Sequence, residues 1–310
     1  MESASGWYFE VCFQFITNQF LYLRANIIVF IWLNRYYKWS DVQIKIRKVK
    51  ILLPKNQIKF INSLKEKKYR QLHNLFIVEG DKIVTEIIQQ DPSKIEQLYL
   101  TEKWYRKSEI GSLQSHSSQI FILKSGEMER ISSFKSPPEV IALIKIPHFQ
   151  LDYDEIAGNF SLVLDKVQDP GNLGNIIRIA DWFGIQHIIC SFDCADCYNP
   201  KVLQSTMGSI MRMKTHYTNL SLFLQKLTSL PDFGIYGTFI NASNIYASGL
   251  LPAGVIIMGN ESKGISKALF PYIREKISIP AFQNRNRRID SLNVAAATAI
   301  ICAEFRRCNG

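Results

Sequence analysis

The sequence predicts an α/β protein with two domains. Its 310 residues exceed the usual size of a single domain. Short apolar runs typical of strands alternate with stretches whose apolar residues recur at helical spacing, and this alternation is typical of layered α/β structure. Hydrophobic residues make up 47% of the chain and charged residues 21%, so we expect a sizeable buried core and no disorder of the chain as a whole.

Residues 1–51 differ in composition from the rest of the chain. They combine many aromatic residues with an apolar run at 27–33 and a basic stretch at 45–50. A membrane-spanning helix needs about 20 mostly apolar residues, and polar residues interrupt this run, so we expect no stable membrane association. We expect that translation starts near Ile51 or Leu52. A peripheral or membrane-associating extension and a packed extension of the fold are the alternatives.

A small first domain is expected at residues 52–148. Apolar residues at helical spacing predict helices within 58–69 and 83–88. Short apolar runs predict strands at 75–78, 95–100, 120–123 and 140–146. The first helical segment is rich in lysine, which is typical of a solvated face or of a surface that contacts phosphate.

The second domain, expected at 159–310 after a polar linker at 149–158, begins with the first of three motifs. Residues 162–180 read as an apolar strand, a Pro-Gly turn and a helix. Asn175 and Arg178 are three residues apart and therefore share one face of that helix. Gly184 fits the C-terminus of the helix. The spacing of a dinucleotide-binding fingerprint or of a phosphate-binding P-loop is absent.

Two further motifs have the same strand-to-loop form. In the second, an apolar strand at 254–258 ends in a glycine-flanked loop that contains Glu261. In the third, a strand at 276–280 is followed by an arginine-rich loop, by Ser291 and Asn293, and by an alanine-rich helix. Ser291 could be an ordinary N-cap of that helix. We expect the arginines of this loop to contact RNA, with a merely solvated loop as the alternative; they are Arg285, Arg287 and Arg288.

Charge and cysteine content narrow the choice of partner and compartment. A formal net charge of +10 favours a polyanionic partner, because lysine and arginine release counterions from phosphates. Six cysteines in a chain of this length do not indicate a disulfide scaffold, so a reducing cytoplasm is the expected location. Cys194 and Cys197 form a CxxC with Cys190 before it. We expect these cysteines to be structural and expect no metal; a zinc site that uses His187, or a redox site, is the alternative.

In this order and at these spacings, the three motifs closely resemble the signature motifs of the SpoU (TrmH-like) branch of the SPOUT RNA methyltransferases. The segment 55–80 resembles the substrate-binding domain that precedes the catalytic domain in many of these enzymes. The resemblance implies a C-terminal α/β domain with a trefoil knot, S-adenosylmethionine as cofactor and methyl transfer to a ribose 2′-hydroxyl of RNA. It also implies a homodimer, with the C-terminal helix at about 292–307 in the interface, although the apolar face of that helix could equally be core.

The resemblance assigns roles to individual positions. Backbone groups and apolar side chains that hold the cofactor are implied at Gly259, Ile279 and Leu292. The polar motif residues are Asn172, Arg178, Glu261, Ser291 and Asn293, with Arg178 the usual catalytic candidate. A guanidinium stays protonated in proteins, so we expect Arg178 to hold a phosphate and to stabilise developing alkoxide charge, assisted by Asn172, Ser291 or a water. Contacts to RNA phosphate are implied in the first domain at Lys59, Lys65, Lys67, Lys68 and Arg70.

Ribosomal RNA is the expected substrate, because the separate N-terminal domain resembles the ribosomal RNA enzymes more than the transfer RNA enzymes. Transfer RNA is the alternative substrate. A non-catalytic RNA-binding or ribosome-assembly protein would share the fold but would have no need for the polar motif residues. A small-molecule nucleotide enzyme with a doubly wound sheet is disfavoured by the missing glycine fingerprint.

Overall fold

The computed structural model describes residues 52–108, 119–282 and 291–309. The expectations for residues 1–51, and those for Arg285, Arg287 and Arg288, lie outside the described residues. Within these ranges, no helix combines the length and the hydropathy that a bilayer crossing requires.

The first sheet has four strands in the order β1-β4-β2-β3. Strands β2 and β3 are parallel, and β4 runs antiparallel to β1 and β2. The predicted strands are confirmed as β1 (Leu75–Glu79), β2 (Ile95–Thr101), β3 (Gln119–Leu123) and β4 (Val140–Lys145). The helices of this region are α3 (Lys55–Ser63), α4 (Lys67–His73), α5 (Asp81–Gln90), α6 (Glu102–Lys107) and α7 (Ser125–Ile131), with a 3₁₀ turn at Pro92–Lys94.

Successive residues of β1 pack on opposite faces of this sheet. Phe76 and Val78 join one buried cluster with apolar residues of α5, and Ile77 joins another with apolar residues of α3 and α7. This alternation follows from the two-residue period of a strand. Both faces are therefore covered, which explains why β4 reads as an uninterrupted apolar run.

The helical spacing between Ile58 and Tyr69 is interrupted. Helix α3 ends at Ser63, and α4 begins at Lys67. Between them, the carbonyl oxygens of Leu64 and Lys65 accept hydrogen bonds of 2.8 and 2.7 Å from the guanidinium of Arg70. These carbonyls would otherwise lack partners beside the end of α3. One continuous periodic pattern in the sequence therefore corresponds to two helices.

The segment expected to be a linker contains helix α8 (Tyr153–Ala157). Asp152 caps this helix, because its carboxylate accepts from the amides of Asp154 and Glu155. Ile156 is fully buried, and Glu155 forms an ion pair of 2.6 Å with Lys214. Residues 152–157 are thus packed against the fold and differ from a free polar linker.

The second sheet has six strands, all parallel, in the order β10-β8-β9-β5-β6-β7. They are β5 (Phe160–Leu164), β6 (His187–Cys190), β7 (Lys214–Tyr217), β8 (Gly234–Asn244), β9 (Gly254–Met258) and β10 (Glu275–Ser278). The helices are α9 (Pro170–Trp182), α10 (Pro200–Thr206), α11 (Leu220–Leu227) and α12 (Val294–Asn309), with 3₁₀ turns at Ser209–Met211, Ile245–Ala247 and Lys267–Tyr272.

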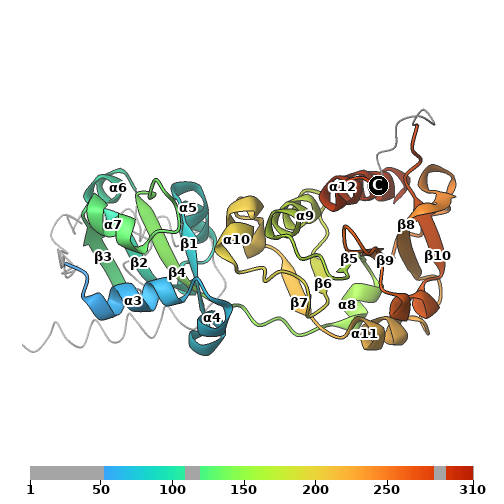
Figure 1. Ribbon diagram of the computed structural model, residues 1–310, viewed down its shortest axis with the longest axis horizontal. Coiled ribbons are helices and arrows are strands. Elements are labelled where there is room, and N and C mark those ends of the chain that lie inside the picture. The colour runs from blue at the N-terminus through green and yellow to red at the C-terminus, as the bar shows by residue number, and fades with distance from the viewer. Residues whose placement is uncertain (1–51, 109–118, 283–290, 310) are drawn as a thin grey trace, which may run out of the picture. The chain divides into compact units, whose positions relative to one another are not determined.

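Helices cover both faces of the parallel sheet. Leu162 and Leu164 of β5 pack in the cluster that includes the apolar sides of α9 and α12, and Val163 packs in the cluster that includes α11. Figure 1 shows α9 and α12 on one side of these strands and α8 and α11 on the other. In such sheets, ligands bind outside the carboxyl ends of the strands, at the point where the strand order reverses. Here that point lies at β5 and β9, which carry the first two motifs.

Candidate active site

The first motif leaves β5 at Asp165 and enters α9. Asp169 is the N-cap, and its side chain accepts a hydrogen bond of 2.8 Å from the amide of Asn172. Pro170 occupies the first helical turn, where its missing N–H and fixed φ cost nothing. At the other end, Gly184 has a φ of +64°, as the sequence predicts for a residue just past a helix C-terminus. The cap and this end together define how α9 presents Asn172 and Arg178.

Helix α12 contributes to holding α9 in place. The guanidinium of Arg306 on α12 donates a hydrogen bond of 2.7 Å to the carbonyl oxygen of Phe183, at the C-terminal end of α9. Carbonyl groups at a helix C-terminus lack partners within the helix and carry partial negative charge. A cation from one motif helix therefore stabilises the other.

The second motif forms a closed loop after β9. The backbone groups of Asn260 and Gly264 pair in both directions, at 3.1 and 2.9 Å. The side chain of Asn260 accepts from the amides of Ser262 and Lys263. A Cβ on Gly259 would lie 2.4 Å from the carbonyl carbon of Gly264, so only glycine permits this close approach.

Two side chains that the sequence analysis did not single out connect the first and second motifs. The side-chain amide of Asn260 donates a hydrogen bond of 2.8 Å to the carbonyl oxygen of Lys166. The buried carboxylate of Asp165 accepts one of 2.6 Å from the amide of Ser266. The position of Asp165, directly after a buried strand, was the available signal. Its partner 101 residues away was not apparent from the sequence.

Asn172, Glu261 and Asn293 come together, one from each motif. The side-chain amide of Asn172 donates to the Glu261 carboxylate at 2.7 Å, and its oxygen accepts from the side-chain amide of Asn293 at 2.8 Å. Asn293 also caps α12, because its oxygen accepts from the amides of Ala295 and Ala296. The interpretation of Ser291 as the N-cap is therefore wrong, because Asn293 takes that role next to the first residue of the helix.

A cavity of about 760 Å³ lies beside this cluster, within the size range of small-molecule and cofactor sites. Its walls include the three residues assigned to the cofactor, Gly259, Ile279 and Leu292. Glu261 and Ser291 line it as well. Backbone of the glycine loop and apolar side chains from β10 and α12 thus meet at the carboxyl edge of the sheet.

Arg178 does not join this arrangement. It is exposed on α9, six residues beyond Asn172, which corresponds to about 9 Å along the helix axis. It does not line the cavity, and among the described residues it has no hydrogen bond or ion pair. The structure therefore joins Asn172, Glu261 and Asn293, places Ser291 on the wall of the cavity beside them, and leaves Arg178 exposed and outside that wall.

The basic residues assigned to RNA in the first domain divide into two groups. Lys59, Lys67 and Lys68 are exposed, and Lys65 is half-buried with its ammonium 2.9 Å from the carbonyl oxygen of Ser132. Burial lowers the pKa of Lys65. Arg70 is only 2% exposed and forms an ion pair with Asp196 in addition to its two carbonyl bonds. The expected contact between Arg70 and RNA phosphate is therefore corrected, because its guanidinium is buried and bonded to groups of the protein itself.

The cysteine cluster packs against the first motif. Cys190, Cys194 and Cys197 are all buried, and the thiol of Cys194 donates to the carbonyl oxygen of Leu164 at the end of β5. A hydrogen bond from Cys190 lowers the pKa of Cys194 to about 7, while burial raises that of Cys197 to about 12. His187 pairs with His216 and Glu155 instead of the cysteines. No metal-binding group of three or more such side chains occurs among the described residues.

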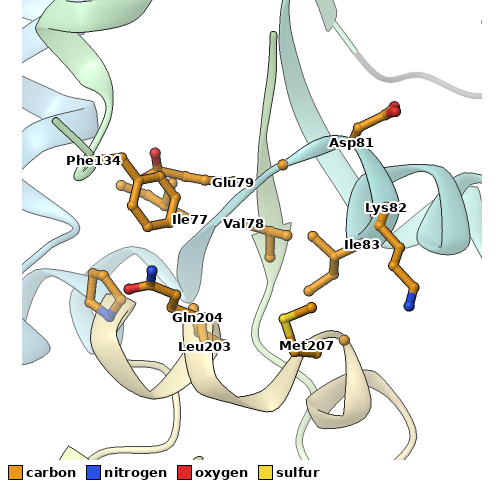
Figure 2. Close-up of a pocket in the computed structure, with 13 residues that line it drawn as sticks. Ile77, Val78, Glu79, Asp81, Lys82, Ile83, Phe134, Leu203, Gln204 and Met207 are labelled. Atoms are coloured by element: carbon orange, nitrogen blue, oxygen red, sulfur yellow. The ribbon is translucent and has the colours of Figure 1, made fainter. Parts of the chain in front are cut away.

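Figure 2 shows a second, smaller cavity of about 230 Å³, lined by residues of β1, the start of α5, and α10. Ile83 and Met207 project into it from opposite sides. Its lining includes none of the residues that the motifs single out. The larger cavity is therefore the candidate active site.

Comparison with known proteins identifies the family of this chain. Residues 159–303 match the model of the SpoU rRNA Methylase family, and residues 55–142 match the MRM3-like substrate binding domain. The chain is 27% identical over 256 residues to the 23S rRNA (guanosine(2553)-2′-O)-methyltransferase RlmP of Bacillus subtilis, which covers 81% of this chain and 97% of the relative. It is 30% identical over 245 residues to the 23S rRNA (guanosine-2′-O-)-methyltransferase RlmB of Blochmanniella floridana, covering 74% and 94%.

Solved structures share the fold over most of the chain. A TrmH-family RNA methyltransferase from Porphyromonas gingivalis aligns with a TM-score of 0.74 and 33% identity, covering 83% of this chain and 99% of its own. An AdoMet-bound rRNA methyltransferase from Sinorhizobium meliloti aligns with a TM-score of 0.72 and 26% identity, covering 83% and 96%.

Proposed function

This chain belongs to the SpoU rRNA methylase family, and from that premise we propose that it transfers a methyl group from S-adenosylmethionine to a ribose 2′-hydroxyl of RNA, in large-subunit ribosomal RNA. The names of RlmP and RlmB support the chemistry and the substrate class. The single observation on this chain that carries the proposal is the meeting of Asn172, Glu261 and Asn293 beside the large cavity. A fold retained for RNA binding alone would not need this polar cluster.

The cavity fits S-adenosylmethionine. Its volume of about 760 Å³ suits a nucleoside-sized ligand, and Ile279 and Leu292 offer apolar contacts for an adenine ring. Gly259 lets the ligand approach backbone groups that can read the edge of that ring. When bound, the sulfonium supplies an electrophilic methyl group. The AdoMet-bound relative from Sinorhizobium meliloti supports this assignment.

The polar cluster orients the reacting groups. The two hydrogen bonds of Asn172 leave its amide with one orientation, NH₂ toward Glu261 and oxygen toward Asn293. Ser291 lines the cavity without serving as the cap of α12, so its hydroxyl is available to a substrate. Arg178 holds a neighbouring phosphate and stabilises negative charge that develops on the ribose oxygen.

The exposed position of Arg178 supports a site shared between two copies of the chain. A guanidinium about 9 Å along α9 from Asn172, outside its own cavity, is well placed to serve the cavity of a partner. We therefore propose a homodimer in the cytoplasm, with the trefoil knot that the family resemblance implies. A fully active monomer in sedimentation analysis would contradict the shared site.

RNA is held mainly through charge. Lys59 on α3 and Lys67 and Lys68 on α4 are exposed and suit phosphate contacts. Transfer RNA is the alternative substrate, and a ribosome-assembly role without catalysis is the alternative function.

The test is transfer of tritiated methyl from S-adenosylmethionine to total RNA that lacks the modification, followed by nuclease digestion and mass spectrometry. We expect a 2′-O-methylated nucleotide in large-subunit ribosomal RNA, and a loss of about 10²- to 10³-fold in kcat in Arg178→Ala. Arg178→Lys should also be impaired, since lysine keeps the charge but loses the planar fork. Label in transfer RNA would overturn the substrate, and no label despite tight cofactor and RNA binding would favour the assembly role.

A further inference from the structure

We propose that Glu261 accepts the proton of the ribose 2′-hydroxyl during methyl transfer. This inference rests on the proposed function and deepens it. A ribose hydroxyl is a weak nucleophile, so a base must take its proton as the new bond forms. Of the five polar motif residues, Arg178 is a permanent cation and the two asparagines and the serine are not bases. The carboxylate of Glu261 is the one group of the five that can accept a proton.

The position of Glu261 suits this role. It is exposed and lines the large cavity, at the carboxyl end of β9. The same loop begins with Gly259, which we assign to the cofactor, so the carboxylate and the reacting methyl group share one cavity. A substrate hydroxyl that enters this cavity meets the carboxylate on its wall.

The hydrogen bonds of Glu261 fix the carboxylate while leaving acceptor positions open. One oxygen accepts from Asn172 at 2.7 Å and the other from Asn260 at 3.4 Å. A carboxylate has about four acceptor positions, so each oxygen keeps one for a substrate hydroxyl. Both donors are neutral amides, and Glu261 forms no ion pair across the described part of the chain, so no salt bridge occupies the carboxylate.

The charged groups nearby are consistent with an available base. Lys166 and Lys263, from the loops on either side, form no ion pair within the described ranges. The side chain of Asp169 is committed to the N-terminus of α9. Asp165 is buried and bound to the amide of Ser266. Neither aspartate competes with Glu261 for the role.

The step balances. The ribose oxygen forms a bond to the methyl carbon as the carbon–sulfur bond breaks, and that electron pair returns to sulfur, giving neutral S-adenosylhomocysteine. The hydroxyl proton passes to a carboxylate oxygen of Glu261 and later to water. No oxidant, metal or further reactant is needed.

The decisive variant is Glu261→Gln, assayed with full-length protein in single turnover on the methylatable RNA. Glutamine keeps an oxygen that can accept from Asn172 but cannot take a proton at neutral pH. We expect kcat to fall by about 10²- to 10⁴-fold, with little change in the affinity for S-adenosylmethionine. Glu129→Gln, at an exposed position of α7, is the matched control and should keep wild-type turnover.

Chemical rescue separates proton transfer from a structural role. In Glu261→Ala, added formate should restore part of the lost turnover in a concentration-dependent way, and it should not restore Glu261→Gln, whose side chain still fills the space. Wild-type kcat in Glu261→Gln would overturn the proposal and leave the methyltransferase function intact. Loss in Glu261→Ala with full activity in Glu261→Gln and no rescue by formate would assign a purely structural role. Wild-type protein that methylates no RNA would overturn the proposed function itself.

Discussion

Asn172 and Glu261 lie 89 residues apart in the chain and are joined by a hydrogen bond of 2.7 Å between their side chains. Asn172 stands in the first turn of α9, and Glu261 lies in the loop after β9. Asn293, at the cap of α12, completes the chain of hydrogen bonds. The three motifs are therefore connected directly through their side chains, at the edge where the parallel strands β5 and β9 end.

Replacing Asn172 should reduce turnover more than cofactor affinity. Asn172→Ala removes both side-chain links, and Asn172→Asp places a second carboxylate against Glu261, where like charges repel. We expect Asn172→Asp to be the worse variant, with kcat at least about tenfold below Asn172→Ala, a difference of about 1.4 kcal/mol. Single-turnover kinetics beside calorimetric titration with S-adenosylmethionine test this order. Equal losses in the two variants would indicate that charge is unimportant there.

Gly259→Ala should weaken cofactor binding. The new Cβ would lie 2.4 Å from the carbonyl carbon of Gly264 and 2.5 Å from the amide nitrogen of Ile265, so the loop must move. Overpacking of this kind costs about 1–3 kcal/mol, and that cost should appear as lower affinity for S-adenosylmethionine in titration. Gly249→Ala meets no atom within 4 Å and is the control. Unchanged affinity in Gly259→Ala would place the cofactor elsewhere.

Arg70→Ala should destabilise the protein instead of selectively weakening RNA binding. Its guanidinium is buried, pairs with Asp196 and holds two carbonyl groups. Removing one partner of a buried pair costs about 3–5 kcal/mol, which chemical denaturation will show. Arg106→Ala, at an exposed i,i+4 pair with Glu102, should change stability by less than about 0.5 kcal/mol. A stable Arg70→Ala protein with weakened RNA binding would restore the original assignment.

Lys67 and Lys68 should contribute to RNA affinity through counterion release. Both are exposed on α4. In the double variant Lys67→Gln/Lys68→Gln, the slope of log affinity against log salt should become shallower by about 1–2, measured by filter binding between low and moderate salt. The control is Lys103→Gln, which replaces an exposed lysine of α6 that pairs with Glu139. An unchanged slope would direct RNA to another face.

His216 should make stability fall on mild acidification. Burial, with help from the charges of His187 and Lys214, lowers its pKa to about 4 from an ordinary 6.5; Glu155 and a hydrogen bond that the ring donates to the backbone of Phe149 act in the opposite direction. The unfolded state therefore binds the proton first, and stability present above pH 6.5 is lost as pH falls toward 4. Between pH 7 and 5 we expect a loss of about 2 kcal/mol in the free energy of unfolding.

The variant His216→Gln should lack that part of the pH dependence, and His148→Gln, at an exposed histidine, should keep it. The lowered pKa of Glu155, whose carboxylate binds Lys214 and His187, adds a further loss only below about pH 4.5. Denaturant titrations at pH 7, 6 and 5 stay above the Glu155 window and therefore report the contribution of His216. If stability depends on pH in the same way in wild type and in His216→Gln, the dependence does not come from His216.

The local pattern of apolar residues predicted much of the secondary structure. The strands and the main helices were predicted from periodicity because each element buries its own apolar side chains. Those side chains lie close together in the sequence, as in Phe76 to Val78 or Leu162 to Leu164. The break between α3 and α4 was missed because no proline or glycine marks it in the sequence. The carbonyl groups that it frees accept hydrogen bonds from Arg70. The cap of α12, a role that the sequence also allows for Ser291, belongs to Asn293: both residue types are good caps, and backbone geometry selects between them.

The sequence by itself determined the α/β class, the three strand-to-loop motifs and the identities of their polar residues, since turn chemistry and strand burial act over a few neighbouring positions. The tertiary structure decided which of those residues meet. A parallel sheet brings the carboxyl ends of β5 and β9 side by side: Leu164 pairs with Met258, 94 positions further along the chain. That register brings Asn172 to Glu261. The burial of Arg70 against Asp196 and the position of Arg178 outside the cavity likewise depend on long-range packing, which the sequence does not show.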